Sequence, residues 1–135
     1  MENGIAVGGV HHLRLTVRDP ARSRDFYTSV LGLHVIAQFG PSFIVGNDRF
    51  FIGLGPAADP AQAPTDDRFN ENRVGLDHVS FHVGSRAELD AAVRMFDERG
   101  IPHGEIVDLG DAFRLYILAF RDPDNIQLEL TATYD

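Results

Sequence analysis

Apolar and polar residues alternate along residues 12–17 and again along residues 78–83. Alternation with a period of two is typical of a β-strand with one buried face and one open face. The apolar members are Leu13, Leu15 and Val17 in the first stretch and Val79, Phe81 and Val83 in the second. The polar members are His12, Arg14 and Thr16 in the first stretch and His78, Ser80 and His82 in the second. Each stretch therefore predicts a strand whose open face carries histidine.

A helix is predicted after each of these strands, beginning seven residues beyond the aligned histidine. Asp19, which is followed by proline, is a suitable N-cap for the first helix. Ser85 and Glu88 form the S-x-x-E pattern of a capping box at the start of the second. Gly32 and Gly100 are predicted to end the two helices, because glycine adopts the left-handed conformation common at helix ends.

Three strand-like runs follow each predicted helix. They read "HVIAQFG", "SFIVGN" and "RFFIGLG" in the first half and "GEIVDLG", "FRLYILAFRD" and "NIQLELTA" in the second. Residues 1–135 are therefore predicted to form a single domain, with module one at 9–55, a linker at 56–74 and module two at 75–135. The predicted fold class is α+β: two βαβββ modules form a curved mixed sheet, with helices outside and a shared concave face.

The concave face is predicted to carry a metal site. In the last strand Leu128 and Leu130 form the apolar set, which turns Glu129 toward the open face. His12, His78 and Glu129 would then supply two imidazoles and one carboxylate, a set suited to Fe(II) and also to Mn, Co, Ni or Zn. A polar sheet face exposed to water explains the alternation equally well. The occurrence of histidine at the same offset in both modules favours the metal.

The amino-acid composition limits which partners, metal ligands and covalent chemistry are possible. The net charge of −8 argues against a nucleic-acid partner, and the absence of cysteine leaves His, Asp and Glu as the available metal ligands. All 12 basic residues are arginines, which excludes Schiff-base chemistry on lysine. The opening "MENGIAVGGV" lacks the features of a signal peptide, and no apolar segment approaches membrane-spanning length. A cytoplasmic protein without a membrane partner is expected.

The two histidine strands, together with "RDP…FYTSVLGL" and "FRDPDNIQLEL", resemble the vicinal oxygen chelate superfamily. That superfamily includes glyoxalases, ring-cleaving dioxygenases and bleomycin- or fosfomycin-resistance proteins. The resemblance covers the chain except for the first eight residues and the linker. It implies paired βαβββ modules around a divalent metal, ligands at His12, His78 and Glu129, and a homodimer.

Two departures from named members of the superfamily limit the expected reaction. When "FIGL" is matched to "QLEL", Gly53 falls opposite Glu129, so the fourth ligand that glyoxalase I carries is missing. Ala119 stands where extradiol dioxygenases carry a tyrosine. The expected function is that of a divalent-metal-dependent enzyme, either a lyase or isomerase of the glyoxalase type or a dioxygenase, acting on a small oxygen-chelating substrate. The alternative is a non-catalytic protein that binds and sequesters a small molecule of the antibiotic type.

Three further residues join Glu129 as candidate catalytic residues. Arg14 either binds an anionic substrate or pairs with an acid such as Glu129, and the pairing is favoured. His82 shares a face with His78 but lies four residues farther along the strand, too far to ligate the same metal, which suits an acid–base role. Tyr116 lies in a run where both faces are apolar, so the pattern does not say which way it points.

Overall fold

The computed structural model describes residues 3–135, which divide into two compact units, one ending at Thr65 and the other running from Asp66 to Asp135. Each unit contains a four-stranded mixed sheet and an α-helix. The α+β class and the two βαβββ modules predicted from the sequence are therefore confirmed. Across residues 3–135, no helix is both long enough and apolar enough to cross a membrane.

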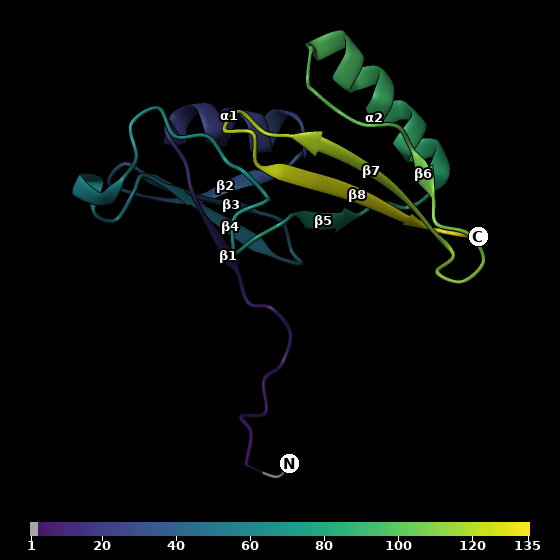
Figure 1. The fold of residues 1–135 in the computed structure, drawn as a ribbon, viewed down its shortest axis with the longest axis horizontal. Coiled ribbons are helices and arrows are strands. Elements are labelled where there is room, and N and C mark those ends of the chain that lie inside the picture. The colour runs from purple at the N-terminus through teal and green to yellow at the C-terminus, as the bar shows by residue number, and fades with distance from the viewer. Residues whose placement is uncertain (1–2) are drawn as a thin grey trace. The chain divides into compact units, whose positions relative to one another are not determined.

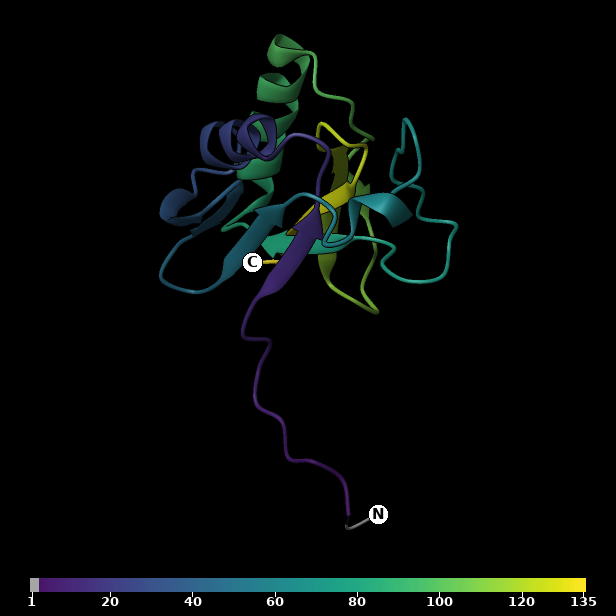
Figure 2. The same ribbon diagram turned by 90° about the vertical axis from the view of Figure 1, so that its left-hand side faces the viewer.

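The sheet of the first unit has the strand order β1-β4-β3-β2, in which β1 and β4 run parallel and the other neighbours run antiparallel. Helix α1 packs against β3 and β4, and residues 3–10 extend away from the sheet (Figures 1 and 2). The elements are β1 (Leu13–Thr16), α1 (Pro20–Ser29), β2 (His34–Phe39), β3 (Ser42–Gly46), β4 (Phe51–Gly55) and a 3-10 turn, η1 (Pro60–Gln62).

The second unit repeats this topology, with the strand order β5-β8-β7-β6 and a parallel pair formed by β5 and β8. Helix α2 packs against β7 and β8 (Figure 1). The elements are β5 (Val79–His82), α2 (Arg86–Arg99), β6 (Val107–Asp108), β7 (Leu115–Arg121) and β8 (Gln127–Thr133). Strand β6 is shorter than the run "GEIVDLG" suggested, because regular pairing with β7 covers Val107 and Asp108.

Two helix ends follow the predicted signals, whereas α1 ends at Ser29 with Val30 as its C-cap, before the predicted Gly32. The Asp19 carboxylate accepts a hydrogen bond from the backbone N–H of Arg22 at 3.2 Å, as expected of an N-cap. Gly100 has a φ of 67° and ends α2, and the N–H of Ile101 reaches the carbonyl of Phe96 at 2.8 Å. Ser85 is the N-cap of α2, but its side chain makes no capping hydrogen bond within the described chain. The predicted capping box is therefore not formed.

Each sheet buries one face under its own helix. The apolar positions of the alternating strands supply that face, as the sequence pattern predicted. The buried set is Leu15, Val17, Tyr27, Val45, Ile52 and Leu54 in the first unit and Leu89, Phe96, Leu118, Phe120, Leu128 and Ala132 in the second. Polar positions of the same strands lie on the opposite face of each sheet, which we call the open face.

Strand register fixes which positions of the two modules correspond. Arg14 pairs with Gly53 across β1 and β4, and Ser80 pairs with Glu129 across β5 and β8. Gly53 therefore occupies in the first module the position that Glu129 occupies in the second, as the matched motifs indicated. By the same register, His12 and His78 stand one residue before equivalent strands.

His103 anchors the segment that follows α2 to the end of that helix by a hydrogen bond to Asp97. One ring nitrogen lies 2.6 Å from the Asp97 carboxylate and the other lies 2.6 Å from the carbonyl of Gly104. Both partners are acceptors, so the doubly protonated ring satisfies both contacts. The Asp97 hydrogen bond, supported by the Gly104 carbonyl, raises the pKa of His103 above its usual value of 6.5.

The His103 contacts are expected to stabilise the fold more at low pH than at high pH. Because the pKa of His103 is raised by folding, its contribution is complete below the unfolded value and is lost as pH rises through the folded value. The loss of unfolding free energy in His103→Gln, measured by urea denaturation, should therefore be larger at about pH 5.5 than at about pH 9. His34→Gln, at an exposed position on β2, is the control. A loss independent of pH would contradict this assignment.

Candidate metal centre

His78 and Glu129 lie close together in the second unit. Glu129 points to the open face from the middle of β8, and its side chain is 14% exposed. His78 immediately precedes β5, the strand paired with β8, and its Nε2 lies 3.8 Å from Oε1 of Glu129. Two of the three ligands predicted from the sequence are therefore neighbours.

The other ring nitrogen of His78 is occupied. Nδ1 lies 2.8 Å from the carboxylate of Asp77, which in its ionised form can only accept a hydrogen bond. In the neutral ring the proton therefore sits on Nδ1, and the lone pair is on Nε2, the nitrogen that lies 3.8 Å from Glu129. Asp77 was not among the residues predicted from the sequence, although the acid directly before the histidine in "GLDHV" was an available signal.

The His78–Glu129 pair fits a divalent metal. Two atoms each about 2.1 Å from one metal lie roughly 3.0–3.4 Å apart in octahedral or tetrahedral geometry. The observed 3.8 Å reaches that range with a small side-chain adjustment. The Asp77–His78 contact also matches the common pattern in which a metal-bound histidine donates its second N–H to a carboxylate. Among residues 3–135, no three His, Asp or Glu side chains gather closely enough to form a complete metal site.

His82 shares the open face with Glu129. In the register of β5 and β8, His82 lies opposite Thr131, and Thr131 in turn hydrogen-bonds the hydroxyl of Ser80. His82 is exposed. Its ring is therefore accessible on the same open face as Glu129, the face that the alternation predicted.

His12 lies in the first unit, beside a pocket of about 300 Å³ on the open face of its sheet. Its ring stacks on Phe51 with 5.4 Å between centroids and an interplanar angle of 6°, and its Nδ1 lies 2.8 Å from Nδ1 of His11. The rest of the lining is mainly apolar and includes Phe39, Phe43, Ile44 and Leu54.

Arg14 lies across the open face of the first sheet. Its guanidinium donates to the Thr16 hydroxyl at 3.1 Å and to the Pro56 carbonyl at 3.0 Å. These neutral oxygens take its donors within the first unit, and a pairing of Arg14 with an acid such as Glu129 stays a prediction. Arg14 depends on the glycines beneath it: a Cβ at Gly55 would lie 2.5 Å from the Arg14 guanidinium.

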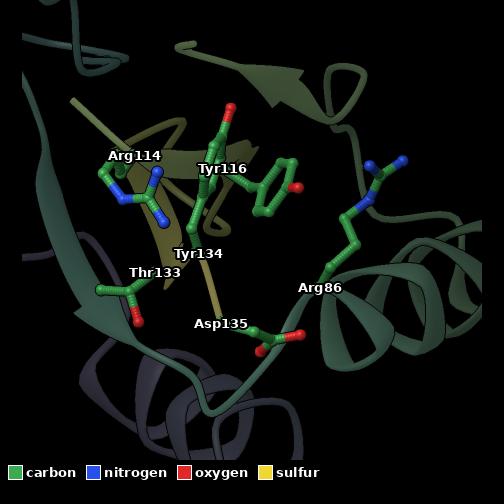
Figure 3. A pocket seen from close by; sticks show the side chains of 6 residues that line it. All are labelled: Arg86, Arg114, Tyr116, Thr133, Tyr134 and Asp135. Atoms are coloured by element: carbon green, nitrogen blue, oxygen red, sulfur yellow. The ribbon is translucent and has the colours of Figure 1, made fainter. Parts of the chain in front are cut away.

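Tyr116 does not join Glu129. The register of β7 and β8 pairs Tyr116 with Ala132, which is buried on the helix side, whereas Glu129 pairs with Ala119. Figure 3 shows Tyr116 between Tyr134 and Arg86, with ring centroids 4.8 Å apart and the guanidinium 5.1 Å from the ring. These residues line a separate pocket of about 230 Å³. Tyr116 is therefore removed from the candidate catalytic set, because its strand turns it to the opposite face.

An ion pair ties the end of the predicted linker to the second unit. Arg121 on β7 donates to both carboxylate oxygens of Glu71, at 2.8 and 3.0 Å. This side-chain hydrogen bond lowers the pKa of Glu71 to about 2. The backbone N–H of Phe69 also donates to the carbonyl of Asp124 at 3.0 Å. Phe69 and Glu71 thus tie the end of the linker to β7 and to the turn before β8, the strand that carries Glu129.

Comparison with known proteins decides the family. The family model described as Glyoxalase/Bleomycin resistance protein/Dioxygenase superfamily matches residues 9–130. The chain belongs to this superfamily. Its match spans both βαβββ modules, including the three predicted ligands, so the resemblance proposed from the sequence is confirmed at the level of the superfamily.

Individual superfamily relatives extend over nearly the whole chain. The uncharacterized protein YwkD of Bacillus subtilis (strain 168) is 30% identical over 90% of this chain and 94% of its own. A glyoxylase/bleomycin resistance protein/dioxygenase domain from Frankia sp. EAN1pec is 31% identical, with a TM-score of 0.79 over 96% and 95% of the two chains. The fosfomycin resistance protein FosX from Listeria monocytogenes, solved with Mn(II) and sulfate, shares the fold at 17% identity, with a TM-score of 0.72 over 95% and 92%.

Proposed function

We propose that this protein is a divalent-metal-dependent enzyme of the glyoxalase or dioxygenase type, acting on a small substrate that chelates through two oxygens. The proposed ligands are His12, His78 and Glu129, and Fe, Mn, Ni, Co and Zn are the candidate metals. The observation that carries the proposal is the His78–Glu129 pair, in which Asp77 takes the other ring nitrogen of the histidine. The Mn(II) present with FosX, a protein of the same fold, is further support.

The residues of the open faces suit this chemistry. When bound, a divalent metal supplies Lewis acidity that polarises a substrate oxygen. His82, exposed on the strand that follows His78, is proposed to transfer a proton to or from the bound substrate. Arg14, whose partners are neutral oxygens, retains its charge for an anionic group on the substrate. The apolar lining beside His12 favours a substrate with a small apolar body.

A non-catalytic role in sequestering a small molecule is the second candidate. The largely apolar pocket beside His12, of about 300 Å³, is within the range of small-molecule binding sites and supports this alternative. Gly53 in place of a fourth carboxylate also fits a binding protein.

We further propose a homodimer, supported by the exposed apolar side chains of Val35, Ile36 and Phe39 on the edge strand β2.

Metal loading tests the enzyme proposal. Untagged protein exposed separately to Fe, Mn, Ni and Zn and then desalted is expected to retain about one equivalent of at least one metal, measured by elemental analysis. Less than about a tenth of an equivalent of every metal would reject the enzyme proposal and favour sequestration. If metal is retained, oxygen uptake with a panel of catechols and reconstituted Fe(II) tests the dioxygenase branch. No uptake would favour lyase or isomerase chemistry.

A further inference from the structure

The Asp77 carboxylate is shared between two donors, His78 just before β5 and Gln127 at the start of β8. It lies 2.8 Å from Nδ1 of His78, and Nε2 of Gln127 donates to the same carboxylate oxygen at 2.9 Å. Nε2 of Gln127 also donates to the backbone carbonyl of Asp77, at 3.1 Å. Gln127 therefore holds both the side chain and the backbone of the residue that contacts the histidine.

Gln127 is itself oriented from the other side. It pairs in register with Arg121 on β7, and NH2 of Arg121 lies 3.5 Å from the side-chain oxygen of Gln127. The same guanidinium is fixed by its two hydrogen bonds to Glu71. A cation beside the amide oxygen turns the amide NH2 group toward Asp77. A continuous chain of contacts thus runs from Glu71 through Arg121, Gln127 and Asp77 to His78.

The chain has a defined effect on the imidazole. With both donors directed at it, the Asp77 carboxylate is restricted in rotation and remains the acceptor for Nδ1–H. The neutral ring is then held in one tautomer, with the lone pair on Nε2, which lies 3.8 Å from Oε1 of Glu129. Without Asp77, the exposed ring would exchange between tautomers in water, and its alternative tautomer would present N–H to Glu129.

We propose that Asp77 and Gln127 are positioning residues that hold the Nδ1–H tautomer of His78 and so direct Nε2 toward the metal position. The proposal rests on the proposed function, because that function makes His78 a ligand. Glu71 and Arg121 anchor the chain of contacts, which gives the segment before β5 a role in the site. Mutation of a residue that hydrogen-bonds a metal ligand, without touching the metal itself, typically lowers metal affinity by about 10- to 100-fold.

The tautomer can be measured without metal. Side-chain ¹⁵N spectra of the metal-free protein, recorded at a pH where His78 is neutral and assigned with His78→Gln, should show the Nδ1–H form of His78. Asp77→Asn should shift the signals toward a mixture of tautomers, and Gln127→Glu, which keeps the size but removes the donor, should shift them less. Asp90→Asn makes the same change of charge on the exposed surface of α2 and should leave them unchanged. Wild-type signals in both Asp77→Asn and Gln127→Glu would overturn the proposal.

Metal affinity gives an independent result. Calorimetric titration with Zn²⁺ should show binding weakened by about 10- to 100-fold in Asp77→Asn and unchanged in Asp90→Asn. Equal affinity of Asp77→Asn and wild type would overturn the positioning role. If wild type does not bind any of the four metals, the proposed function fails, and the tautomer measurement still decides whether Asp77 and Gln127 control His78.

Discussion

His78→Ala is expected to abolish metal binding, whereas His82→Ala should leave the metal bound and change only the rate of the reaction. His78 faces Glu129 across 3.8 Å, so its loss removes a proposed ligand and leaves the Glu129 carboxylate alone in the second unit. His82 lies opposite Thr131, farther along the same open face. The affinity loss in His78→Ala should exceed the roughly 100-fold upper value typical of residues that only support a ligand.

Elemental analysis and calorimetry on both variants separate the two roles. Glu129→Gln keeps the shape of the side chain but removes the charge, and it should match His78→Ala in metal loss. Circular dichroism of each variant checks that the fold is retained. Equal metal loss in His78→Ala and His82→Ala would mean that the ligand on this strand has been wrongly assigned.

The repeat and the alternation predicted most of the fold because both follow from local rules. Each strand after a histidine alternates with a period of two, although the apolar set is buried at Leu15 of β1 and only half-buried at Val79 and Phe81 of β5. The same parity places Glu129 and His82 on one open face and identifies Gly53 as the counterpart of Glu129. These predictions required only the alternation of apolar and polar residues within each module and its repetition in the other.

Other features depend on contacts between segments that alternation does not encode. Tyr116 lies in a strand with apolar residues on both faces, so only its register with β8 settles its direction. Arg14 takes neutral oxygens as partners because Gly53 and Gly55 let its side chain lie flat on the sheet. The contact between Asp77 and Gln127 joins residues 50 positions apart and depends on the pairing of β5 with β8.

Phe96→Ala is expected to cause the largest loss of stability among the changes considered for this chain. Phe96 is 1% exposed and stacks on Phe120 with 4.7 Å between ring centroids. Its removal leaves a cavity between α2 and β7, and truncation of a buried phenylalanine costs about 3–5 kcal/mol. That is a large part of the roughly 5–15 kcal/mol by which a domain is stable. Urea denaturation at equilibrium should show a lower transition midpoint.

Phe113→Ala provides the matched control, because it removes the same atoms from a side chain that is 68% exposed, and it should change stability by no more than about 0.5 kcal/mol. Similar losses in the two variants would show that the packing of α2 on its sheet does not determine stability. The packing of Phe96 on Phe120 also concerns the strands that carry the proposed metal ligand Glu129. Phe120 and Glu129 lie on paired strands but on opposite faces, so the helix that packs on Phe120 supports the strands that carry the proposed ligand.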